Sequence, residues 1–78
     1  MSGEEELGLE ISAHARRRMM LRNVSGQQVS AILVLCPRSI DQGDGTYLYQ
    51  AFVDNRNLGV VRALDGVIVT VLDFDRSD

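Results

Sequence analysis

His14, Arg18 and Arg22 are the residues of this chain whose types and spacing best suit chemistry. At about 100° per residue, a helix through them would place all three within roughly 80° of one another, as one stripe. Apolar residues flank the stripe on both sides, so the cationic row is costly unless an anionic group meets it. Imidazole exchanges a proton near neutral pH, and arginine can clamp a phosphate through two parallel hydrogen bonds. We therefore predict that these three residues form a catalytic or anion-binding site.

Further residues extend this predicted site. We assign phosphate contacts to Arg17 and to Arg62, although Arg17 can instead form a solvated face with the acidic residues near the N-terminus. Tyr47 or Tyr49 could stack on a base or supply a hydroxyl. Thr70 is a candidate supporting residue in a valine-rich strand, where β propensity alone also explains a threonine.

Several other kinds of site are excluded by the residue types present. The single histidine and the single cysteine, Cys36, lie far apart in the sequence, so no metal site is expected. One cysteine also excludes an internal disulfide framework. The pair Gly43 and Gly45 lacks the lysine and the following helix of a phosphate-binding loop. We expect neither a metal nor a cofactor.

Length and composition set the class of protein. Its 78 residues, 45% hydrophobic and 24% charged, fit one small folded domain, which we place at residues 11–75 after an acidic tail at 1–10. No apolar stretch is long enough for a membrane helix, so we expect a cytoplasmic protein without a membrane partner. The net charge of −3 argues against general attraction to nucleic acid. All eight basic residues are arginine, which suits phosphate or carboxylate.

Two helices are predicted in the first half of the chain. Ser12 can cap the first, with Asn23 as its end. Ser25 and Gln28 have the form of a capping box for the second, which Pro37 ends. Because the joint between the helices is short, we expect a hairpin or a corner.

Beyond the helices the apolar period changes to two, which predicts strands. The expected strands cover residues 38–42, 46–53, 58–64 and 67–74. Asp65-Gly66 predicts a type I′ hairpin that would place Arg62 opposite Val69 and Val61 opposite Thr70. Both faces of this hairpin are apolar, so we expect helices on one and a partner or second copy on the other. The predicted fold class is α+β, with two N-terminal helices packed on a three- to four-stranded antiparallel sheet.

The order of these residues resembles a small bacterial family that is still a domain of unknown function. The shared pattern is Ile-Ser-Ala-His-Ala-x-x-Arg-Met-x-x-Arg-Asn-Val-Ser-x-x-x-Val from residue 11, followed by strands at 60–62 and 68–71. It is similar to BrnT-type toxins and, more distantly, to the RelE and barnase-like ribonuclease fold. The resemblance implies that His14, Arg18 and Arg22 are the helix signature, Arg62 the strand arginine and Thr70 the closing-strand threonine.

Three functions remain open from the sequence. The resemblance implies a toxin-like, metal-independent endoribonuclease that an antitoxin or another protein partner holds in check. The acidic balance and the absence of lysine favour a non-catalytic module of the same fold that binds a phosphorylated ligand or a protein, such as a phage or plasmid modulator of host defence. The third possibility is a structural homodimerisation module whose arginines pair internally. The ribonuclease is the first choice because the resemblance spans both helix and sheet.

Overall fold

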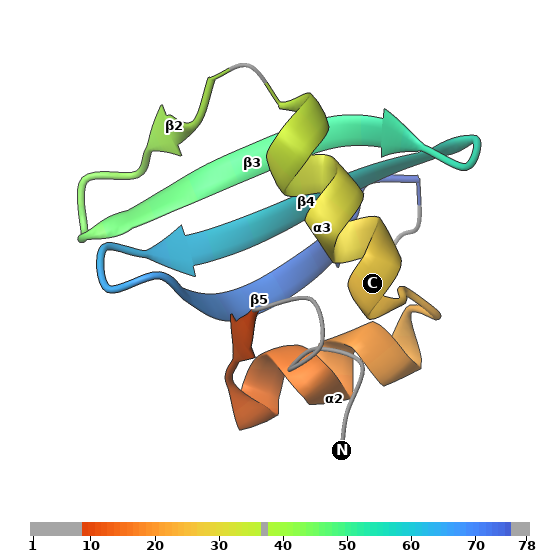
Figure 1. The fold of residues 1–78 in the computed structure, drawn as a ribbon, viewed down its shortest axis with the longest axis horizontal. Helices are drawn as coiled ribbons and strands as arrows, with labels where there is room; N and C mark the ends of the chain where they lie inside the picture. The colour runs from red at the N-terminus through yellow and green to blue at the C-terminus, as the bar shows by residue number, and fades with distance from the viewer. Residues whose placement is uncertain (1–8, 37, 76–78) are drawn as a thin grey trace.

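A computed structural model describes residues 9–36 and 38–75 of the chain. Most of the predicted acidic tail, residues 1–8, lies outside this range. The described elements follow one another as β1 Glu10–Ile11, α2 Ala13–Leu21, α3 Gly26–Leu35, β2 Ile40–Asp41, β3 Thr46–Val53, β4 Arg56–Ala63 and β5 Val67–Asp73 (Figure 1). The α+β class and the two helices before the main strands are thus confirmed.

The sheet differs from the predicted one in size and in one strand direction. It has five strands in the order β1-β5-β4-β3-β2, and β1 runs parallel to β5 whereas the other pairs are antiparallel. The prediction of three to four antiparallel strands is therefore wrong in these details. The two-residue β1 is too short to produce an alternating pattern, and it exists because Glu10 and Ile11 lie beside Val67 and Ile68.

The tight hairpin lies at a different turn from the one predicted. Asp54 and Asn55 both have positive φ, +52° and +63°, which makes the β3–β4 connection a two-residue type I′ turn. In the β4–β5 connection, positive φ is confined to Gly66, at +95°, and the Gly66 N–H donates to the Ala63 carbonyl over 2.9 Å. The type I′ prediction at Asp65-Gly66 is therefore wrong.

A β-bulge changes the register of the last hairpin. Val61 pairs with Thr70, as predicted, but Arg62 pairs with Ile68 and not with Val69. The loop is longer than the predicted two-residue turn, and the bulge adds one extra residue on β5. The two changes cancel, so the strands beyond the bulge pair in the predicted register.

Both helices begin where local signals predict, and Pro37, the predicted end of the second helix, lies outside the described residues. The Ser12 hydroxyl accepts from the Ala15 N–H over 3.1 Å, and α2 gives way to Asn23 with φ +53°. Ser25 and Gln28 form the complete capping box at the start of α3. These contacts span at most four residues, so the sequence specifies them without help from the rest of the fold.

The core lies between the helices and one face of the sheet (Figure 1). Its buried members are Ile11, Ala15, Met19, Val24, Val29, Ile32, Val53, Leu58, Val60, Ile68 and Val71. Strand parity puts Leu48, Phe52 and Leu72 on the opposite face. No described helix packs on that face, and Phe52 is 65% exposed there. The predicted partner on this face stays a prediction.

Candidate functional site

The packing of α2 against the sheet separates the three residues of the predicted stripe, His14, Arg18 and Arg22. Ala15 and Met19 are buried against the sheet, whereas His14 is exposed and Arg18 half-buried. Arg22 lies only about 20° from Ala15 around the helix axis, so its side chain reaches the sheet. The three residues therefore do not meet one common ligand surface.

Arg22 binds the backbone of β5. Its Nη1 donates to the Val71 carbonyl over 2.9 Å, beside the Val69 carbonyl that accepts from the Ser12 hydroxyl over 3.1 Å. Strand β1 pairs only with Val67 and Ile68 of β5. The two contacts to the Val69 and Val71 carbonyls therefore satisfy backbone acceptors on the part of the β5 edge that β1 leaves unpaired. Arg22 is thus a positioning residue that ties α2 to the sheet.

A smaller group of basic side chains remains on α2, with one imidazole and two guanidinium groups. Arg17 and Arg18 lie about 60° and 40° from His14 around the axis and one turn further along the helix. None of the three side chains is bonded to another described residue. We call His14, Arg17 and Arg18 the α2 cation surface.

A second group of predicted residues meets at one end of the sheet. Tyr47 pairs directly with Arg62 across β3 and β4, and Tyr49 is two residues further along β3 on the same face. The three side chains line a pocket of about 410 Å³ together with residues 63–66 of the hairpin. The structure therefore brings Arg62 and both tyrosines together around one pocket.

The two groups do not line one common pocket. Arg16 and Met20 line a groove between α2 and α3, whereas His14 and Arg18 project on the other side of the buried Ala15. The pocket at the sheet end is lined by no described residue of α2. The structure therefore does not place His14 in the pocket that Arg62 lines.

Thr70 belongs to neither group. It pairs with Val61 and shares strand parity with Leu72, which places it on the sheet face opposite the helices. Among residues 9–36 and 38–75, no side-chain hydrogen bond joins Thr70 to either group, and its supporting role stays a prediction.

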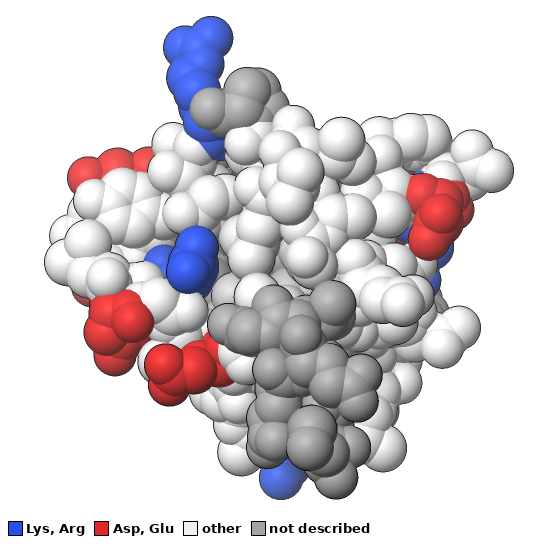
Figure 2. Space-filling view, viewed as in Figure 1, with Lys and Arg blue, Asp and Glu red and all other residues white. Residues whose placement is uncertain are grey.

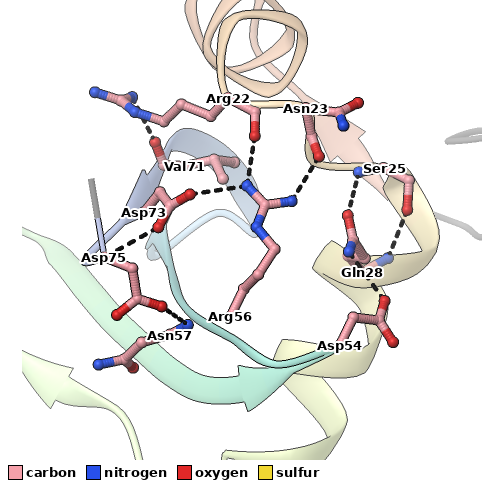
Figure 3. A network of polar contacts seen from close by, with 10 residues as sticks. All are labelled: Arg22, Asn23, Ser25, Gln28, Asp54, Arg56, Asn57, Val71, Asp73 and Asp75. Carbon is pink, nitrogen blue, oxygen red and sulfur yellow. Dashed lines mark hydrogen bonds and ion pairs between the residues drawn. The ribbon is translucent and has the colours of Figure 1, made fainter. Parts of the chain in front are cut away.

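Arg56 is an important residue outside the predicted strands, the third of which is expected to begin at residue 58. Its Nη2 lies 2.8 Å from the Asp73 carboxylate, and the same guanidinium donates to the carbonyls of Arg22 and Asn23 at the end of α2 (Figure 3). The Asp73 side chain is only 2% exposed. This network joins β4, β5 and the corner between the helices, and it satisfies orphan carbonyls at a helix end.

A signal for Arg56 was present in the strand pattern. Arg56, Leu58, Val60 and Arg62 alternate, so extending the β4 pattern by two residues places Arg56 on the helix-covered face. The surrounding Asp-Asn-Arg-Asn sequence is typical of turns, so it does not indicate a strand that begins at Arg56.

The basic side chains do not merge into one large patch on the face seen in Figure 2, where the blue groups lie apart from one another. Among the described residues no three His, Cys, Asp or Glu side chains gather as a metal site would need. No described helix has the length and apolar character to cross a membrane. The arrangement thus offers two small sites that contain arginine: the α2 cation surface and the sheet-end pocket.

Neither family models, nor curated proteins, nor solved structures gave a match to this chain.

Proposed function

We propose that this chain is a small endoribonuclease of the RelE and BrnT type, with the α2 cation surface as the place where RNA is cleaved. The observation that supports the proposal is the position of His14, which has two guanidinium groups one turn away and no described partner.

The proposed reaction needs a base and cations. The His14 imidazole takes the proton of a ribose 2′-hydroxyl, and the 2′-oxygen attacks the adjacent phosphorus. The bond from phosphorus to the 5′-oxygen breaks, which leaves a 2′,3′-cyclic phosphate and a 5′-hydroxyl protonated by solvent. Arg17 and Arg18 hold the two non-bridging oxygens, whose negative charge rises in the transition state.

The test is expression of the wild type, His14→Ala and Arg18→Ala in a bacterial host, with growth and RNA integrity followed together. Arg38→Ala is the matched control, because Arg38 is an exposed arginine outside both helices. We expect growth arrest and RNA fragments with 2′,3′-cyclic phosphate ends from the wild type and the control only. Intact RNA in cells that contain abundant folded wild-type protein would refute the proposal.

A non-catalytic phosphate-binding module is the second candidate. Helix α2 carries no carboxylate, tyrosine or second histidine that could act as a general acid beside His14. This function predicts that the purified chain binds a short RNA through Arg17 and Arg18 but leaves it uncut. A gel shift and a cleavage assay on the same RNA separate the two candidates.

A further inference from the structure

The sheet-end pocket combines features that the α2 cation surface lacks. Helix α3 crosses the middle of the sheet in Figure 1, and neither helix lies over the end where β3 begins and β4 finishes. The pocket there is lined by Tyr47, Tyr49, Arg62 and the hairpin 63–66. It shares no residue with the α2 cation surface.

The Arg62 guanidinium is held in place by the hairpin. Its Nε donates to the Gly66 carbonyl over 3.1 Å, whereas its two terminal nitrogens donate to no other described residue. Gly66 has φ +95°, which favours glycine, so the turn that presents this carbonyl depends on that residue. One edge of the guanidinium is thus fixed, and its terminal nitrogens stay available to a ligand.

Two tyrosines complete the pocket. Both are half-buried, and Tyr49 also packs against the core. Neither hydroxyl bonds to a described residue. Aromatic rings and unused donors therefore surround one arginine.

We propose that this pocket binds a nucleoside monophosphate unit, with the phosphate on Arg62 and the base against a tyrosine ring. A planar guanidinium suits two oxygens of one phosphate, and aromatic rings stack on any base. The hydroxyls of Tyr47 and Tyr49 supply further hydrogen bonds to the sugar or phosphate.

Asp65 limits the charge of the ligand. It also lines the pocket, and its Oδ1 accepts from the Val67 N–H over 3.1 Å. One arginine and one carboxylate leave the pocket without net positive charge, which disfavours a triphosphate. We therefore expect a monophosphate to bind more tightly than the corresponding triphosphate.

The experiment is a titration of the full chain, labelled with ¹⁵N, with AMP, CMP, GMP and UMP. Adenosine, inorganic phosphate and ATP are the component controls. The proposal expects saturable shifts at residues 47, 49 and 62–66, with adenosine and phosphate each about tenfold or more weaker than AMP. Arg62→Met should weaken AMP by about tenfold or more, since a charge-assisted contact is lost.

Two further variants separate this inference from the proposed cleavage. Arg18→Gln should leave AMP binding unchanged while it impairs the α2 cation surface. Tyr47→Phe keeps the ring and the fold, and should weaken AMP less than Arg62→Met does. The pocket is refuted if no monophosphate gives saturable shifts at millimolar concentration, or if the shifts map to α2 instead. If the shifts map to α2, the proposal of a nucleotide pocket is wrong, whereas the proposed function of the α2 cation surface is favoured.

Discussion

Replacement of Arg56 by methionine tests the network that joins the helix corner to the sheet. Methionine keeps most of the side-chain volume but removes the charge that faces Asp73, whose side chain is 2% exposed. Removing one partner of a buried ion pair costs about 3–5 kcal/mol. Because the Arg56 side chain is 25% exposed, solvent screens the pair and we expect the lower end, about 3 kcal/mol.

Such a loss is large for a chain of 78 residues. At roughly 0.05–0.15 kcal/mol per residue, its whole stability is about 4–12 kcal/mol. The melting temperature should fall by about 12–24 °C, since about 1 kcal/mol shifts it by about 4–8 °C in a domain of this size.

The assay is urea denaturation followed by circular dichroism, with Arg38→Met as the matched control. We expect the control to change the free energy of unfolding by less than about 0.5 kcal/mol, as at most surface positions. Adding Asp73→Leu to Arg56→Met should recover part of the loss, because the uncompensated charge is gone. A cost of Arg56→Met below about 1 kcal/mol would refute the reasoning, since it would equal that of an exposed pair.

Three smaller changes test local features. Ser25→Ala removes the capping box of α3 and should lower the free energy of unfolding by about 1 kcal/mol in urea denaturation; an unchanged midpoint would contradict its role. The Thr46 hydroxyl holds the pKa of Asp44 below its usual 3.8, so Thr46→Val should raise that pKa in a carboxyl NMR titration. Ionised Asp44 contributes stability that is present above pH 3.8 and is lost as pH falls through the lower pKa of the folded state, and this contribution should shrink in Thr46→Val. An unchanged pKa of Asp44 in the variant would exclude the hydroxyl as the cause. A Cβ on Gly59 would lie 2.7 Å from Cε2 of Phe74, but that ring is 44% exposed and can turn aside. Gly59→Ala should therefore cost less than about 1 kcal/mol, and a loss above about 2 kcal/mol would mean that the ring is pinned.

The candidate sites could be predicted in part. The sequence identified Arg62, Tyr47 and Tyr49, which the structure places around one pocket, because strand alternation puts them on one face. It grouped Arg22 with His14 from helical spacing and from the resemblance, yet the structure binds Arg22 to the Val71 carbonyl. Helical spacing gives relative angles but not which side of the helix meets the sheet.

By itself the sequence determined what depends on neighbouring residues. The caps at Ser12 and Ser25 and the alternation of β3 use contacts within a few positions, so they can be read directly from residue types.

Only the tertiary structure decided what depends on residues far apart in the chain. Strand β1 exists through pairing with Val67 and Ile68, and the bulge at Arg62 is defined only against β5. Arg56 reaches Asn23, 33 positions away, and Arg22 reaches Val71 across 49. Any arginine side chain can donate to a backbone carbonyl, so the residue type does not tell which arginines do so. Tertiary packing alone decides which arginine is bound in this way and which remains available to a ligand.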